Sequence, residues 1–202
     1  MISNFKFQIS NYNSSKGFTL LELVVVLGLF MLIMGVTVSM FISIIQHQKR
    51  ILSQQEMLNQ ASYVQEYIAR SLRTAAVDTA GTCLVQDAVA YKGYTYLLTR
   101  FDAPTGFFQG IQFISGEGVC QEFFLDSDGT FKETKNGGAP QNLISGKFKL
   151  QHARFVINGN KNTWATLVGG AVWPRVTLSL AIKDSSYEKS REIVIQTTIS
   201  KR

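Results

Sequence analysis

A long apolar stretch near the N-terminus dominates the pattern of hydrophobic and polar positions. Residues 18–45 are almost wholly apolar, contain no proline and include a single charged residue, Glu22. A helix over this stretch would be about 42 Å long at roughly 1.5 Å per residue, which exceeds the roughly 30 Å core of a bilayer. The pattern predicts a transmembrane helix with one carboxylate near its start, and an acid in a membrane segment is a candidate functional residue.

Small residues recur within this stretch. Gly28, Gly35, Ser39 and Ser43 follow one another at spacings of seven and four, which places them along one face of a helix. Such a face permits two helices to approach closely in lipid or in a filament core. Glycine is also frequent in membrane helices in general, so that alternative explains the two glycines equally well.

The helical period continues beyond the apolar stretch, over residues 46–76, with polar side chains on the opposite face. One stripe of apolar residues at spacings of three, four and seven is expected to dock this half of the helix onto a sheet. The stripe consists of Ile51, Leu58, Ala61, Val64, Ile68, Leu72 and Ala75.

Beyond residue 76 the pattern changes to short alternating or β-branched runs separated by Gly, Asn and Asp. These runs predict a mainly antiparallel sheet, with strands at 88–99, 111–114, 119–126, 130–135, 147–157, 175–183 and 192–200. The expected fold is α+β, a long N-terminal helix packed on a β-rich head. The expected divisions are a leader at 1–17, the helix at 18–76 and the head at 77–202.

The segment from Asp126 to Gly129 has the sequence DSDG and lies between two of these strands. It predicts a hairpin turn in which the glycine supplies a positive φ. Weak calcium binding by Asp126 and Asp128 is the alternative. A full calcium loop needs a glutamate at its twelfth position, where this chain has Gly137.

The net charge and the two histidines bear on two classes of function, nucleic-acid binding and catalysis. The net charge is +6 without a long basic run, so a nucleic-acid partner is not favoured, although weak non-specific binding stays open. The two histidines, His47 and His152, have no nucleophile or acid at a catalytic spacing. The sequence therefore predicts neither an enzyme nor a cofactor.

The two cysteines, Cys83 and Cys120, are 37 positions apart and lack the spacing of a zinc site. A disulfide is expected if the head lies outside the cytoplasm. The alternative is a pair of buried free thiols.

Residues 16–22, with the sequence KGFTLLE, precede the apolar stretch without a gap. This run resembles the type IV prepilin signal shared by pilins and type II secretion pseudopilins. The resemblance implies that a prepilin peptidase cuts between Gly17 and Phe18 on the cytoplasmic membrane face and methylates the new Phe18 amine. It also implies that Glu22 pairs with the Phe18 amine of a neighbouring subunit, which is physically reasonable because each buried charge is costly without a partner.

The resemblance implies a structural subunit of a pilus or pseudopilus, held in the bacterial inner membrane with its N-terminus cytoplasmic and its head outside. Its partners would be the peptidase, other subunits and membrane lipid. A minor subunit is favoured because the head is large and the three prolines, Pro104, Pro140 and Pro174, all lie in the head. The alternatives are a signal-anchored membrane protein with an outer β-rich ligand-binding domain, and a membrane-tethered enzyme.

Overall fold

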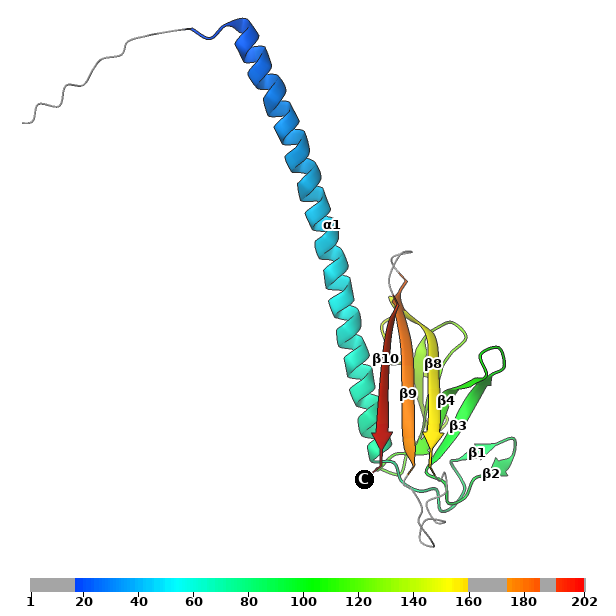
Figure 1. Cartoon of the computed structure of the whole chain (residues 1–202). Coiled ribbons are helices and arrows are strands. Elements are labelled where there is room, and N and C mark those ends of the chain that lie inside the picture. Colours follow the sequence, from blue (N-terminus) through cyan, green and yellow to red (C-terminus); the bar gives the residue numbers. More distant parts are fainter. Residues whose placement is uncertain (1–16, 160–173, 186–191, 202) are drawn as a thin grey trace, which may run out of the picture. The chain divides into compact units, whose positions relative to one another are not determined.

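The computed structural model describes residues 17–159, 174–185 and 192–201, and Figure 1 shows its elements. The chain forms two compact units, Met1–Arg50 and Ile51–Arg202. One helix, α1 (Leu20–Arg73), begins in the first unit and ends in the second. In the described residues it is followed by β1 (Val85–Gln86), β2 (Val89–Ala90), β3 (Tyr96–Asp102), β4 (Phe107–Ile114), β5 (Cys120–Leu125), β6 (Phe131–Lys135), β7 (Gln141–Asn142), β8 (Phe148–Asn158), β9 (Arg175–Asp184) and β10 (Ile193–Ser200).

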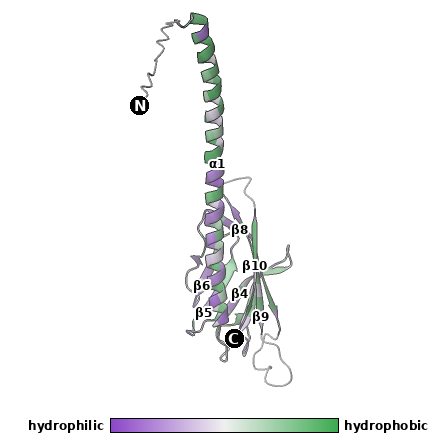
Figure 2. Cartoon of the chain, turned by 60° about the vertical axis from the view of Figure 1, so that its left-hand side comes forward, coloured by the Kyte–Doolittle hydropathy of each residue, from purple (hydrophilic) through white to green (hydrophobic). Residues whose placement is uncertain are grey.

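Helix α1 changes character along its length. Its N-terminal half is mostly hydrophobic apart from a hydrophilic position near its start, whereas hydrophilic positions recur through its C-terminal half (Figure 2). The helix is two residues shorter at its start and three shorter at its end than the predicted span of 18–76. It ends early because Ala76 leaves the helix and donates its N–H to the Ile114 carbonyl at 2.8 Å.

The main sheet has the strand order β10-β9-β8-β4-β5-β6-β7, and β3 pairs with β4. All strand pairs in the described part of the chain are antiparallel, which confirms the predicted sheet and the α+β class. Strand β4 joins two groups of strands, since Phe108 pairs with Phe155 of β8 while Gly110 pairs with Phe124 of β5. A side chain at Gly110 would crowd Thr99 and come within 3.2 Å of the Phe124 Cβ atom, so glycine is required at this junction.

The core of the second unit lies between the C-terminal half of α1 and one face of the main sheet. Six helix residues in this core are at most 4% exposed: Met57, Ala61, Val64, Ile68, Ala69 and Leu72. They pack with buried aromatic and aliphatic residues of the sheet, including Phe113, Phe123, Phe131, Phe155, Leu178 and Leu180. Apolar area removed from water stabilises this packing.

The predicted helix stripe is correct in its C-terminal part and wrong in its N-terminal part. Ala61, Val64, Ile68, Leu72 and Ala75 are buried, as expected. Ile51 and Leu58 are 52% and 45% exposed, and Met57 and Ala69 are buried instead. The helix face that packs on the sheet therefore does not include the first two predicted positions. Several helical stripes are apolar, and contact with the sheet determines which of them is buried.

Six of the seven predicted strands match observed strands, with the start of β4 placed four residues late. The exception is 88–99, which was expected to be one strand. Positive φ angles at Ala88 and Gly93 break it into the end of a small hairpin, a turn and the start of β3. The short strands β1 and β7 were not predicted, because a strand of two residues is too short to show alternating apolar and polar positions.

Candidate functional site

The first turn of α1 begins directly after the predicted cleavage bond. Gly17, Phe18 and Thr19 are exposed and non-helical. Thr19 is the N-cap, because its carbonyl accepts the Leu23 N–H at 3.2 Å and its hydroxyl accepts the Glu22 N–H at 3.3 Å. The Gly17–Phe18 bond therefore lies outside the helix, where backbone is open to another protein.

Thr19 is a helix cap that sequence reasoning did not single out. The signal was present, since Thr-x-x-Glu is the sequence of a capping box. The cap places Glu22 in the first turn, where the partial positive charge of the helix N-terminus favours a carboxylate. No basic side chain among the described residues pairs with the Glu22 carboxylate.

The apolar half of α1 has no packing partner within the described residues. Its large hydrophobic side chains are all at least 37% exposed from Leu20 to Ile45, and this helix is the one described segment long and apolar enough to cross a membrane. Gly28 and Gly35 have no atom within 4 Å of where a Cβ would stand. The Ser39 hydroxyl donates to the Val36 carbonyl at 2.8 Å. Helix packing through these small residues stays a prediction.

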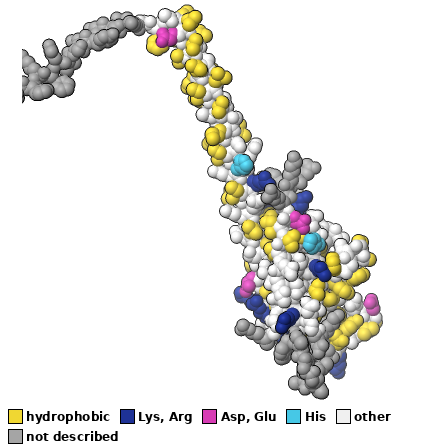
Figure 3. Space-filling view, viewed as in Figure 1, with side chains coloured by type: hydrophobic (Ala, Val, Ile, Leu, Met, Phe, Trp, Pro, Cys, Tyr) yellow, Lys and Arg dark blue, Asp and Glu magenta, His cyan; other side chains and the backbone are white. Residues whose placement is uncertain are grey.

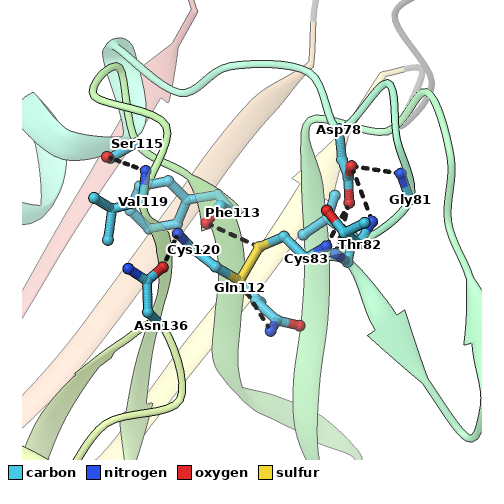
Figure 4. Close-up of a disulfide and its surroundings, with 11 residues drawn as sticks. Asp78, Gly81, Thr82, Cys83, Gln112, Phe113, Ser115, Val119, Cys120 and Asn136 are labelled. Atoms are coloured by element: carbon cyan, nitrogen blue, oxygen red, sulfur yellow. Dashed lines mark hydrogen bonds between the residues drawn. A yellow bond between two sulfur atoms is a disulfide. The ribbon is translucent and has the colours of Figure 1, made fainter.

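Cys83 and Cys120 form a disulfide, as expected from the sequence, with their Cα atoms 5.5 Å apart. The bond fastens the segment between α1 and β3 to the first residue of β5 (Figure 4). On the other side of the bond, the Cys120 N–H donates to the Asn136 side-chain oxygen at 2.9 Å.

Asp78 organises the same segment and was not predicted, since a lone aspartate in a loop carries no sequence signal. Its carboxylate accepts backbone N–H bonds from Gly81, Thr82, Cys83 and Leu84 at 2.6–3.3 Å. Burial acts to raise the pKa of Asp78, but these four backbone bonds outweigh burial and hold the pKa below its usual value. The ionised carboxylate therefore fixes the loop that carries Cys83.

Replacing Asp78 with asparagine is expected to lower the free energy of unfolding by about 1–3 kcal/mol, since buried N–H donors lose a charged acceptor. Because the folded-state pKa is depressed, this stabilisation is present at neutral pH and is lost as pH falls below about 4. Urea unfolding at neutral and acidic pH measures both effects. The difference between the parent protein and Asp78→Asn should shrink in acid; a difference that is constant with pH would contradict this role.

The segment from Asp126 to Gly129 is a turn between β5 and β6, as predicted. The Gly129 N–H donates to the Asp126 carbonyl at 3.0 Å, and Gly129 has a φ of 76°. The Lys132 ammonium pairs with both Asp126 and Asp128. Hydrogen bonds from the Thr130 side chain and backbone lower the pKa of Asp128 to about 2. Calcium binding here stays an untested alternative, and the lysine already supplies these carboxylates with a cation.

The two histidines do not lie in a common site. His47 is exposed on α1, and the Nδ1 atom of His152 in β8 lies 4.0 Å from a Glu192 carboxylate oxygen. Within the part of the chain that the structure describes, no three His, Cys, Asp or Glu side chains are grouped so as to hold a metal ion.

Comparison with known proteins finds one match, at the N-terminus. A family model described as the prokaryotic N-terminal methylation motif matches residues 12–38, which include the predicted cleavage bond, the Thr19 cap, Glu22 and both helix glycines. Neither a curated protein nor a solved structure matches the chain. The chain thus carries the N-terminal signature of the type IV pilins and pseudopilins, a family of structural subunits that are processed before use.

Proposed function

We propose that this protein is a structural subunit of a type IV pilus or a type II secretion-like pseudopilus, cut between Gly17 and Phe18 and assembled through residues 18–45. One observation carries the proposal. The methylation motif covers the Gly17–Phe18 bond, which is exposed and non-helical. The helix half that follows this bond has no packing partner in the described residues. Such an apolar surface must be covered by lipid or by other helices.

The charges at the start of the helix determine the axial register in which neighbouring subunits assemble. Cleavage creates an ammonium on Phe18, one residue before the Thr19 cap, where the positive end of the helix disfavours a cation. Glu22 of a neighbouring subunit offsets that cation, and the two charges match only in one axial register. Gly28, Gly35 and Ser39 then permit close approach of the helices.

Before assembly, the same helix holds the protein in the inner membrane with its N-terminus in the cytoplasm and its β-rich unit outside. The Cys83–Cys120 disulfide supports the outer location, because structural disulfides persist in oxidising compartments. The partners in this scheme are a prepilin peptidase, other subunits and membrane lipid. A minor subunit is favoured because the apolar helix contains no proline.

Coexpression with an active prepilin peptidase is expected to lower the mass of the protein by that of residues 1–17, with or without an added methyl group. Intact-mass spectrometry measures this loss. An inactive peptidase and the variant Gly17→Val should both leave the mass unchanged. Full-length protein after exposure to the active enzyme would instead favour a signal-anchored membrane protein with an outer ligand-binding domain.

A further inference from the structure

A groove lies on the face of β8, β9 and β10 that points away from the core. Side chains alternate between the two faces of a strand. Phe155 and Leu178 point into the core with α1, so Arg154 and Thr177 point to the opposite face. The floor of the groove is formed by β8 and β9, one side includes Gln196 of β10, and the other side is the turn between β3 and β4.

The groove contains one strong cation and several uncharged polar groups. The Cζ atom of the Arg154 guanidinium lies over the Phe107 ring, 3.7 Å from its centre, in a cation–π contact. Arg154 has no carboxylate partner among the described residues, and no aspartate or glutamate lines the groove. The Glu192 carboxylate lies near the groove, beside His152. A planar cation without an acid partner is suited to a carboxylate.

Neutral hydrogen-bonding side chains surround this cation, namely Thr177, Ser179, Gln196 and Asn158. Hydrophobic side chains gather beside the groove near the turn between β3 and β4, whereas the surface over β9 and β10 carries few charges (Figure 3). Strand β9 in this floor is paired on both sides, with β8 and with β10. A ligand on this floor therefore meets hydroxyl and amide groups and one guanidinium, with an aromatic wall.

The single guanidinium and the neutral polar side chains of the groove favour one class of ligand over others. A nucleic acid requires several cations along its backbone, whereas the described residues that line the groove include two basic side chains, Arg154 and His152. An extended peptide binds through a free strand edge or through apolar pockets, whereas the floor of this groove is a sheet face with polar side chains, and its strand β9 is paired on both sides. A hydroxyl-rich chain with spaced carboxylates matches both the neutral side chains and the single guanidinium.

We propose that this groove binds an acidic polysaccharide, with Arg154 holding a uronate carboxylate and Thr177, Ser179 and Gln196 bonding to sugar hydroxyls. The contact with the Phe107 ring holds the guanidinium in the groove, where the carboxylate would bind. This function belongs to the second unit and does not depend on cleavage at Gly17 or on filament formation.

Titration of the detergent-solubilised full-length protein with polygalacturonate, followed by calorimetry, tests the proposal. The parent protein is expected to bind, and Arg154→Gln is expected to weaken binding by on the order of tenfold or more, since a charge-assisted hydrogen bond is lost. Arg154→Lys should recover part of the affinity. Thr177→Val together with Gln196→Leu should weaken binding without changing the net charge.

Arg73→Gln is the matched control, because it removes an exposed arginine from the end of α1, outside the groove. It should bind polygalacturonate as the parent does, and circular dichroism should show every variant folded. Dextran, which lacks carboxylates, and polyglutamate, which lacks hydroxyls, should bind at least tenfold more weakly, as expected when a ligand leaves polar groups of a site unpaired. Absence of polygalacturonate binding, equal binding by Arg154→Gln, or equal binding of dextran or polyglutamate would overturn the proposal.

Discussion

The variant Glu22→Leu is expected to insert into the membrane as well as the parent protein, or better, and to be excluded from filaments. A carboxylate in lipid is costly, so its removal favours insertion. In a filament, the same change leaves the Phe18 ammonium of the neighbouring subunit buried without a partner, which costs about 3–5 kcal/mol and lowers incorporation about a hundredfold or more. Membrane fractionation and immunoblotting of sheared filaments measure the two quantities.

Glu66→Gln is the control for this experiment. It removes an exposed acid from the same helix, and its partner Arg70 lies 3.4 Å away on the surface, where an ion pair contributes little. This variant should enter filaments at the parent level. Normal incorporation of Glu22→Leu would remove Glu22 from its proposed role, whereas loss of both variants would point to a general sensitivity of the helix.

Removing the disulfide is expected to cause the largest loss of stability in the second unit. The double variant Cys83→Ser, Cys120→Ser opens a loop closed across a separation of 37 residues, and the chain-entropy model gives a loss of about 3–4 kcal/mol for a loop of this size. Urea unfolding followed by circular dichroism measures the loss. Hydrogen exchange should become faster first at Gly81 and Leu84, whose N–H groups bond to Asp78.

Thiol labelling and the effect of reduction on the unfolding midpoint test whether the disulfide forms and stabilises the unit. The unreduced parent protein should take up no thiol label after denaturation, and reduction should lower its unfolding midpoint to that of the double variant. Two labels per unreduced chain, or an unchanged midpoint in the double variant, would show that the disulfide does not stabilise the unit.

The elements that could be predicted from sequence are those with a long, repeated pattern. Strands β8, β9 and β10 were expected at 147–157, 175–183 and 192–200, within one residue of where each is observed, because one face of each strand is more buried than the other and the alternation is sustained. The apolar half of α1 was equally clear. The methylation motif covers the expected functional residues at 17–22, because these residues lie in one short run whose chemistry is local.

What sequence could not supply depends on contacts between distant residues. Asp78 acquires its importance from a loop that bends back on it, and Met57 replaces Leu58 in the core because the sheet selects the helix face. The groove around Arg154 combines side chains from four strands and a turn, and no spacing along the chain marks it. The Asp126–Gly129 turn was predictable, but the pairing of its carboxylates with Lys132 was not.

The N-terminus of the subunit in an assembled fibre tests the central claim most directly, because an ion pair between Glu22 and a neighbour requires a free amine on Phe18. Sheared, washed fibres should be dissolved and the N-terminal peptide of this subunit sequenced by mass spectrometry. A peptide that begins at Phe18, with or without a methyl group on its amine, is the predicted result. A subunit that still begins at Met1 within a functional fibre would contradict the proposed assembly.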